Sequence, residues 1–291
     1  MILKKYVARH QGYLWIAPSF FLVVGTTIFP LFFAFSFSLY ETSFFERVKF
    51  VGFQNYIQLF SESRFWTDVL NSVYFTFGSV IIALLFGIGL ALMIRESSRI
   101  NSVYRTIILI PWVTNEVVLA LMWKWLLNPQ MSILYYWTKE LGLNVPNLLA
   151  SENTVLATMT IINAWRSLGF TMIMIQAALS AIPKELEEAC LVDGAGYAKK
   201  VFHVILPLIK PVILVVTIVI TISFFNIVSL VLTMTGGGPG FSTEVMSIRL
   251  YKEAFRFFNI GYAGVLTMVI LVLNIFFVYN YKKLISNESY Y

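Results

Sequence analysis

The sequence predicts an all-α membrane protein that crosses the bilayer six times and keeps both termini in the cytoplasm. Of its 291 residues, 58% are hydrophobic and 12% are charged, with a mean hydropathy of +0.78, whereas a soluble domain carries about a quarter charged residues. The apolar residues gather in runs long enough to cross roughly 30 Å of hydrocarbon as helices. The expected spans cover 13–40, 71–93, 106–127, 154–179, 208–234 and 261–281.

The distribution of basic residues orients these spans. Six crossings place both termini on one side, and that side carries 12 of the 21 basic residues against 8 on the other. These are Lys4, Lys5, Arg9, Arg95, Arg99, Arg105, Lys184, Lys199, Lys200, Lys210, Lys282 and Lys283. A basic excess marks the cytoplasmic side. The net charge of +6 is thus a topology signal, and nucleic acid is not needed to explain it.

The first apolar run is expected to be a retained span. Residues 1–11 are basic, as at the start of a signal peptide, but the run that follows is too long for an h-region and shows no clear small-residue cleavage site. Pro18 and Pro30 lie inside the run. Neighbouring helices can satisfy the carbonyl groups that a proline frees within a membrane.

The connections between the spans differ in character. Residues 41–68 form a mixed polar and aromatic loop, and the loop 128–153 contains a local helical pattern at 133–141. After the fifth span, a Gly-rich turn at 236–240 leads to an amphipathic segment at 245–258. The chain shows no low-complexity tract and no convincing internal repeat, so a single transmembrane domain is expected.

The longest polar interruption in the second half of the chain predicts a small helical motif at 183–207. Pro183 can occupy a first helical position, where a missing N–H costs nothing, and the acidic residues that follow it lie near the positive end of the helix dipole. Gly194 tolerates the left-handed conformation that ends helices. A second helical run is expected at 197–204, before Pro207. The motif is therefore a helix, a glycine joint and a second helix.

This motif resembles the EAA loop of permease subunits in binding-protein-dependent ABC importers. The matching residues are Glu188-Ala189-Cys190, Asp193-Gly194-Ala195 and Ile205-Leu206-Pro207, with Cys190 in place of the usual Ala or Ser. In that family the loop docks into a cleft on the ATPase subunit. The resemblance therefore implies ATPase-coupling roles for Glu188, Ala189, Asp193, Gly194, Ala195, Ile205, Leu206 and Pro207.

A second match resembles the segment that joins the last two spans in the sugar and glycerol-phosphate branch of that family, the maltose-type permeases. It consists of Leu232-Thr233, Gly236-Gly237-Gly238-Pro239-Gly240, Ser242-Thr243, Tyr251, Ala254-Phe255 and Gly261-Tyr262-Ala263. The resemblance implies the type I ABC importer permease fold. It also implies a solute that is an oligosaccharide, a monosaccharide derivative or a glycerol phosphodiester.

The same resemblance implies a set of partners. These are a second homologous permease subunit, two ATPase subunits and an extracytoplasmic solute-binding protein, assembled in the cytoplasmic (inner) membrane of a bacterium or archaeon. ATP and Mg²⁺ would bind the partner ATPase, and no cofactor is expected in this chain. The Gly236–Gly240 run is not a phosphate loop, because no Lys-Ser or Lys-Thr follows it.

Polar and aromatic side chains inside the spans are candidates for lining the solute pathway. Charges in a membrane are costly and face protein or water, while amides, acids and aromatic rings suit the hydroxyl groups and C–H faces of sugars. The candidates are Trp112, Asn115, Glu116, Asn163, Trp165, Arg166, Phe225 and Asn226. The alternative is that they hold helices together. The sequence leaves open whether Glu116 and Arg166 form an ion pair.

Other classes of function are less well supported by the residues. The single Cys190 excludes an intramolecular disulfide, and His10 and His203 are too separated to suggest a metal site. No nucleophile elbow, HExxH or carboxylate pair supports an enzyme. An ion-coupled secondary transporter of a small polar solute is the main alternative to the importer subunit.

Overall fold

The structure, a computed structural model, describes residues 2–96, 98–143 and 146–286 of the chain. The chain forms two compact units. The first comprises Met1–Ser63 and Leu250–Val272, and the second comprises Arg64–Arg249 and Leu273–Tyr291. The boundaries near the C-terminal end fall inside two helices, α12 (Met246–Phe255) and α13 (Ile260–Ser286).

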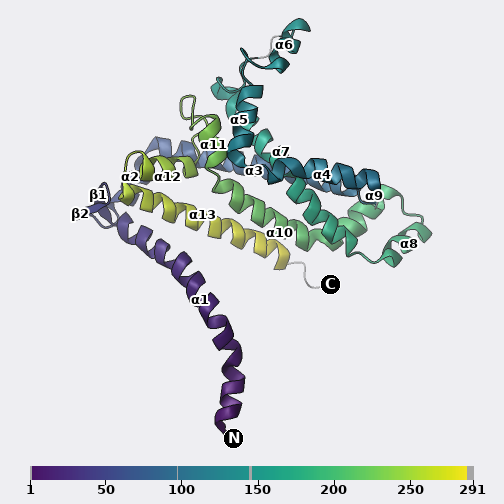
Figure 1. The fold of residues 1–291 in the computed structure, drawn as a ribbon, viewed down its shortest axis with the longest axis horizontal. Helices are drawn as coiled ribbons and strands as arrows, with labels where there is room; N and C mark the ends of the chain where they lie inside the picture. Colours follow the sequence, from purple (N-terminus) through teal and green to yellow (C-terminus); the bar gives the residue numbers. More distant parts are fainter. Residues whose placement is uncertain (1, 97, 144–145, 287–291) are drawn as a thin grey trace. The chain divides into compact units, whose positions relative to one another are not determined.

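A long helix, a hairpin and a short helix form the N-terminal part of the first unit (Figure 1). They are α1 (Ile2–Ser38), β1 (Tyr40–Ser43), β2 (Glu46–Phe50) and α2 (Gln54–Ser61). α1 confirms that the first apolar run is helical, with Pro18 and Pro30 inside it. Polar contacts then fix the end of this helix, since the Asn55 amide donates to the carbonyl groups of Ser38 and Tyr40 at 2.9 and 3.0 Å.

The hairpin overturns the expectation of an entirely helical chain. β1 and β2 pair antiparallel, and Phe44 turns the chain with a positive φ of 54°. The loop expected over 41–68 is also wrong, because it contains the hairpin, α2 and the beginning of α3 (Ser63–Met93). The strands are rich in aromatic and β-branched residues, which favour extended backbone, but they are too short to give a clear period-two pattern.

Small residues let the first turns of α13 approach the end of α1. A Cβ at Gly264 would collide with the carbonyl of Ala34 and the backbone of Ser38. The N–H of Gly261 donates to the hydroxyl of Thr42 at 2.9 Å. Close backbone approach through small residues is a common way of packing membrane helices.

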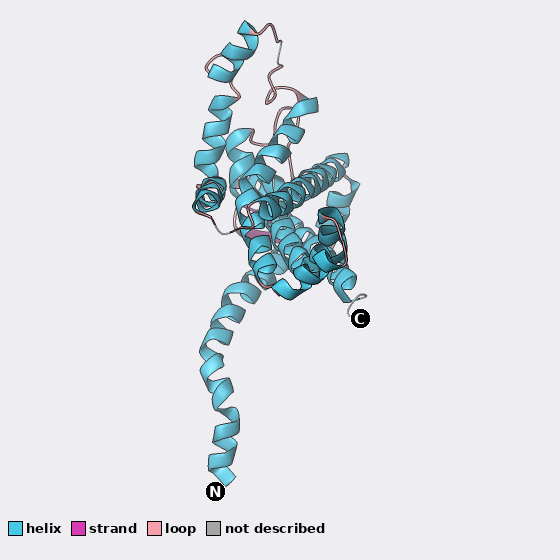
Figure 2. Cartoon of the chain, turned by 90° about the vertical axis from the view of Figure 1, so that its right-hand side faces the viewer, coloured by secondary structure: helices cyan, strands magenta, loops and turns pink. Residues whose placement is uncertain are grey.

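The second unit contains the remaining helices, and Figure 2 shows that helices account for nearly all of the regular structure. In chain order they are α3 (Ser63–Met93), α4 (Arg99–Val113), α5 (Glu116–Leu126), α6 (Ile133–Glu140), α7 (Glu152–Ser180), α8 (Lys184–Val192), α9 (Tyr197–Lys200), η1 (Val201–Ile205), α10 (Leu206–Phe225) and α11 (Ser229–Met234). The local helix expected at 133–141 is confirmed by α6, and the amphipathic segment expected at 245–258 by α12.

Two of the expected spans are broken. The run at 106–127 is divided between α4 and α5, which meet at an angle of 97°. Asn115 caps α5 there by accepting the N–H of Val117 at 2.9 Å. The run at 208–234 ends at Phe225, and a separate short helix, α11, follows. In the sequence these breaks are marked only by short polar interruptions, Thr114-Asn115-Glu116 and Asn226, and apolar residues resume directly after each.

Among the described residues, four helices are long and apolar enough to cross a membrane, and the bent α4–α5 pair would make a fifth. α7 has 29 residues, about 44 Å at a rise of 1.5 Å per residue, but its composition is too polar for this group. The polarity of α7 is explained by its packing against other helices. α7 contributes buried residues to three hydrophobic clusters among the described residues of the second unit, including Met159, Ala164 and Met172, so other helices cover the face that carries them.

Two ion pairs connect α3 with the segment that precedes and begins α12. Asp68 accepts from the guanidinium of Arg249 at 3.0 Å, and both side chains are at least 95% buried. One turn earlier, Arg64 pairs with the fully buried Glu244 and its guanidinium stacks on the ring of Phe241 at 3.9 Å. Nothing in the local sequence indicates these partners, which lie about 180 positions apart.

Replacing Asp68 with Asn is expected to destabilise the second unit, because it removes the carboxylate that pairs with the buried Arg249 at 3.0 Å. Breaking one side of a buried pair costs about 3–5 kcal/mol. The control is Asp193→Asn, the same change at an exposed position. Thermal unfolding of the detergent-solubilised protein should show a clear fall in midpoint for Asp68→Asn and none for the control. Equal midpoints would contradict the stabilising role of the pair.

Candidate functional site

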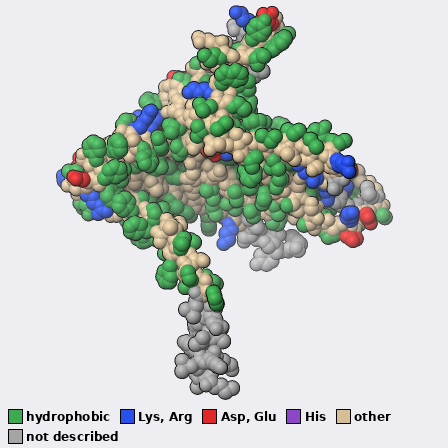
Figure 3. All heavy atoms as spheres, viewed as in Figure 1, with side chains coloured by type: hydrophobic (Ala, Val, Ile, Leu, Met, Phe, Trp, Pro, Cys, Tyr) green, Lys and Arg blue, Asp and Glu red, His purple; other side chains and the backbone are tan. Residues whose placement is uncertain are grey.

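The predicted coupling helix is present and exposed. α8 lies apart from the long helices of the second unit, joined to α7 and α9 by loops (Figure 1). Charged side chains gather around it, as Figure 3 shows. Glu188 and Ala189 are exposed, and the apolar Leu186 and Val192 are 42% and 87% exposed. Exposed apolar residues beside charged ones suit a surface for another protein.

The glycine joint has the geometry that the sequence predicts. Gly194 adopts a φ of +69°, a region that other residues rarely enter. The N–H of Ala195 bonds the carbonyl of Cys190 at 2.9 Å, and the N–H of Asp193 bonds that of Ala189 at 3.0 Å. The first of these is the six-to-one bond of a Schellman cap. Apart from Gly194 and its chain neighbours, no described atom lies within 4 Å of where a Cβ at Gly194 would be, so the positive φ is what favours glycine here.

The second half of the motif differs from the expectation. The helical run predicted at 197–204 is confirmed, but it does not end before Pro207, because α9, η1 and α10 form one continuous helix over Tyr197–Phe225. The N–H of Leu206 bonds the carbonyl of Val201, five residues earlier. Such a π turn accommodates Pro207, which has no N–H to donate, without ending the helix.

The eight predicted coupling residues therefore fall into two groups. Glu188, Ala189, Asp193 and Gly194 are exposed, with Ala195 half-buried beside them. In contrast, Ile205 is 1% exposed and belongs to a hydrophobic cluster with α3 and α7, against which Leu206 also packs. Pro207 lies exposed on the same helix. The first group forms a projecting surface, and the second anchors its base.

Glu116 and Arg166 meet in the structure. Nη1 of Arg166, near the middle of α7, lies 3.0 Å from Oε1 of Glu116 in the first turn of α5. The Arg166 side chain is 8% exposed and that of Glu116 is 32% exposed. The break between α4 and α5 brings the carboxylate to this position, because Glu116 is the first residue after the bend.

Among the described residues, Arg166 and the nearby Asn163 on the same helix carry buried polar atoms without hydrogen-bond partners. Both amide atoms of Asn163 and the Nε of Arg166 are buried with no hydrogen-bond partner among the described residues. Asn163 lies three positions before Arg166, so the two side chains share one face of α7. Leaving such groups unpaired costs about 1–3 kcal/mol each. They therefore require water or another polar group that reaches this face.

The aromatic candidates pack against other rings. Trp112 tilts against Phe170 of α7 with ring centroids 5.3 Å apart, and Trp165 contacts Trp123 edge to face at 5.4 Å. Trp112 remains 41% exposed. Each contact joins α7 to one half of the bent α4–α5 pair.

Phe225 and Asn226 lie at the end of α10. Phe225 is 1% exposed and packs against Phe277 at 5.5 Å. Asn226 is exposed and its amide donates to the carbonyl of Ile222 at 2.7 Å. Neither forms a hydrogen bond or ion pair with Glu116 or Arg166 in the part of the chain that the structure describes. The eight pathway candidates thus include one polar cluster centred on Arg166 and two residues beside the α10–α11 break.

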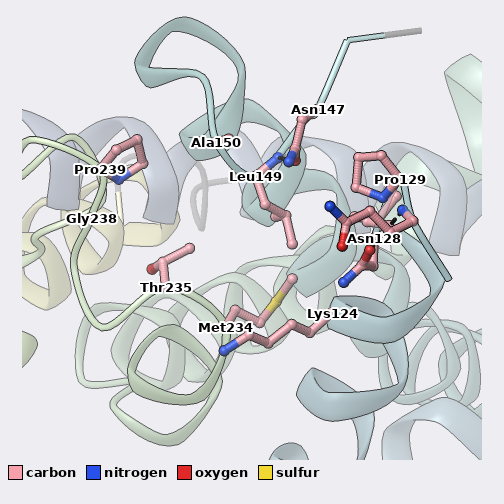
Figure 4. A pocket seen from close by; sticks show the side chains of 12 residues that line it. Lys124, Asn128, Pro129, Asn147, Leu149, Ala150, Met234, Thr235, Gly238 and Pro239 are labelled. Atoms are coloured by element: carbon pink, nitrogen blue, oxygen red, sulfur yellow. Dashed lines mark hydrogen bonds between the residues drawn. The ribbon is translucent and has the colours of Figure 1, made fainter. Parts of the chain in front are cut away.

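An open pocket of about 560 Å³, which the sequence does not predict, is lined by α5, the residues before α7 and the Gly-rich turn. Figure 4 shows Leu149 and Met234 pointing toward one another across it, with the amides of Asn128 and Asn147 near its rim. Lys124 lies along its floor and donates to the carbonyl of Thr233 at 3.4 Å. The only indication of this pocket in the sequence is the polar composition of the segments that line it.

Residues 83–284 match the family described as the inner membrane component of binding-protein-dependent transport systems. The chain belongs to this family. The matched residues include the coupling motif, the polar cluster on α7 and the Gly-rich turn. This permease is thus a multi-pass membrane subunit of a transport system, and no comparison supports an ion-coupled secondary transporter.

Relatives that match most of this chain are also named as transport system permease proteins. It is 31% identical over 281 residues to the trehalose/maltose transport system permease protein MalF of Thermococcus litoralis, with 94% of each chain covered. It is 31% identical over 284 residues to the sulfoquinovosyl glycerol transport system permease protein SmoG of Agrobacterium fabrum, covering 97% of this chain and 92% of that protein. The sn-glycerol-3-phosphate permease UgpA of Shigella flexneri is 28% identical over 274 residues, covering 91% of this chain and 90% of UgpA.

Solved structures support the fold. The permease aligns with a chain of a bacterial ABC transporter involved in the import of the acidic polysaccharide alginate, with a TM-score of 0.85 and 20% identity over 99% of this chain and 100% of that one. A second structure, of a bacterial alginate ABC transporter in complex with an alginate pentasaccharide-bound periplasmic protein, gives a TM-score of 0.82 and 21% identity over 97% and 96% of the two chains. At these identities the likeness concerns the fold alone.

A double-mutant cycle should measure the Glu116–Arg166 pair. Glu116→Gln leaves a buried cation and is expected to destabilise the permease by about 3–5 kcal/mol. Arg166→Gln leaves a carboxylate that is one-third exposed, so the expected loss is smaller. The double variant should lose less stability than the sum of the single variants, measured by thermal unfolding in detergent. Additive losses would show that the two charges do not interact.

Proposed function

We propose that the permease forms half of the translocation pathway of an ATP-driven importer for a sugar or sugar-like solute, and that α8 couples it to a separate ATPase subunit. The single observation that carries the proposal is the exposed, glycine-capped helix α8 at the family's coupling position. ATP and Mg²⁺ would bind the partner ATPase. A second permease subunit would supply the other half of the pathway, and an extracytoplasmic binding protein would deliver the solute.

Coupling would use both groups of motif residues. The exposed face with Glu188 and Val192 would seat in the ATPase cleft, with Glu188 as an electrostatic anchor. The base around Ile205 packs against Met172 and Ile175, so a movement of α8 would be passed to α7 and α10 through a close-packed cluster. Closely packed interiors transmit such displacements because they compress little.

The proposed topology keeps six crossings, with α4–α5 as a bent third crossing and α7 as the fourth. Both termini and α8 would lie in the cytoplasm, in agreement with the basic residues on that side. α7 would be tolerated in the bilayer because its polar groups face protein. The membrane would be the cytoplasmic membrane of a bacterium or archaeon, as in the organisms of the named relatives.

The polar cluster on α7 would line part of the solute pathway. Asn163 and the Nε of Arg166 offer buried hydrogen-bonding atoms without protein partners, which the hydroxyl groups of a sugar could satisfy during passage. Because Glu116 neutralises Arg166, the cluster favours a neutral, hydroxyl-rich group over an anion. Trp112 would add a ring face for the C–H surface of a sugar.

Gly194→Val is expected to reduce solute uptake while ATP hydrolysis by the assembled complex continues. A β-branched residue at positive φ costs roughly 1–2 kcal/mol, which changes a conformational equilibrium about 5–30-fold. Gly196→Val is the matched control, because Gly196 has an equally open surrounding but an ordinary φ of −65°. Uptake and hydrolysis would be measured in proteoliposomes that contain the whole complex and its binding protein.

Normal uptake by Gly194→Val would contradict the coupling role of the glycine joint. The same proteoliposomes test the wider proposal. The permease alone, in vesicles with a proton or sodium gradient, should give no solute flux. Flux under those conditions would instead identify a secondary transporter.

A label next to Lys199 should react only from the cytoplasmic side. A single cysteine introduced at exposed Tyr197, in a Cys190→Ser background, would be treated with a membrane-impermeant maleimide in intact cells and in inverted vesicles. Labelling is expected in inverted vesicles alone. Labelling in intact cells would place α8 outside and exclude contact with a cytoplasmic ATPase.

A further inference from the structure

A continuous groove runs between α3 and α7 on the second unit. Two hollows, of about 530 Å³ and 430 Å³, lie end to end along these helices. They share two lining residues, Tyr74 of α3 and Ala157 of α7. The groove is separate from the coupling helix and from the residues of the Arg166 cluster, none of which line it.

The two parts of the groove differ in polarity. The first part has hydroxyl, amide and carboxylate groups from Thr67, Asn71, Glu152, Asn153 and Ser242. The second part is apolar apart from the hydroxyl groups of Thr160 and Tyr74, and its lining includes Phe77, Ile81, Ile82 and Ile161. The change from polar to apolar occurs once, at Tyr74, which is 54% exposed.

The dimensions match one leaflet of a bilayer. The apolar part extends along α3 from Val73 to Ile82, which corresponds to about 14 Å at a rise of 1.5 Å per residue. One leaflet of a bilayer contributes about 15 Å, half of a hydrocarbon core of roughly 30 Å. A tyrosine at the junction is typical of the membrane–water interface, where an amphipathic ring reaches both regions.

The polar end carries one negative charge. Glu152, in the first turn of α7, is the only acidic or basic residue that lines this part of the groove. Its carboxylate forms no ion pair with the residues that the structure describes. The nearby Arg64 stacks on the ring of Phe241, which also lines this part of the groove. The guanidinium of Arg64 forms an ion pair with Glu244. The groove therefore offers a free carboxylate to a cationic group at the level of lipid headgroups.

We propose that this groove binds one phospholipid with a zwitterionic, amine-bearing headgroup. One acyl chain lies between Phe77, Ile81 and Ile161, and the amine lies beside Glu152. With the proposed topology, the lipid belongs to the outer leaflet. The inference depends on the membrane location of the family and not on the identity of the solute. A partner protein that occupied the groove would need one surface that is polar against the first part and apolar against the second, with the change at Tyr74.

The test uses the complete transporter purified in detergent. Native mass spectrometry would count lipid adducts after incubation with dioleoyl phosphatidylethanolamine or dioleoyl phosphatidylglycerol at equal concentration. Ala157→Leu fills the junction of the two hollows and is expected to lower the number of bound ethanolamine lipids about tenfold. The control is Ala177→Leu, the same change at an exposed position of α7, which should bind as the unmodified protein does.

The headgroup is tested by Glu152→Gln, which keeps the shape of the side chain. It should retain lipid but lose a preference of roughly threefold for ethanolamine over glycerol headgroups, the size expected for an exposed charge pair. Unchanged binding by Ala157→Leu would overturn the groove as the site. Equal binding of both lipids by the unmodified protein would overturn the headgroup assignment.

Tyr74→Cys, in a Cys190→Ser background, tests whether a protein occupies the groove in place of a lipid. Cross-linking of this cysteine to a second permease subunit, in a complex without lipid adducts, would show that a protein covers the groove. Uptake measured in the same preparations separates this inference from the proposed function. Loss of lipid binding with normal uptake would concern the groove alone, and failure of uptake with normal lipid binding would concern the transport proposal alone.

Discussion

The second unit depends on the burial of α7 among other helices. This helix carries an arginine, asparagines, threonines and two serines along a length sufficient to cross a membrane, and such groups are costly in contact with hydrocarbon. Packing against α3, the bent α4–α5 pair and α10 removes them from that contact. α7 residues take part in three hydrophobic clusters among the described residues of this unit, and the same helix carries Arg166 and Asn163.

The polar cluster and the coupling motif are connected through this helix. Arg166 lies near its middle, and Met172, Ile175 and Leu179 pack at its C-terminal end in the cluster that also holds Ile205. Under the proposed coupling role, a movement at the base of α8 would reach the Arg166 region through this one helix.

The bend between α4 and α5 has a chemical consequence. In a straight helix through this region, Glu116 would lie about one turn beyond Trp112 on the same helix axis. With the break, Glu116 becomes the first residue of a new helix and its carboxylate reaches Arg166. Asn115 stabilises the start of the new helix, since its side-chain oxygen accepts the N–H of Val117 in the first turn of α5. Broken helices are tolerated within membranes where side chains or water satisfy the backbone in this way.

The sequence alone determined several features of this protein that depend on interactions between residues close together in the chain. Composition and run length identified a membrane protein, the acidic helix and Gly194 gave α8 and its cap, and the quoted motifs gave the family, because each depends on neighbours in the chain. Only the tertiary structure decided the Asp68–Arg249 and Glu116–Arg166 pairs, the breaks after Val113 and Phe225, and the groove between α3 and α7. These depend on which faces of distant helices meet, and apolar periodicity is the same whether a run is straight, bent or interrupted.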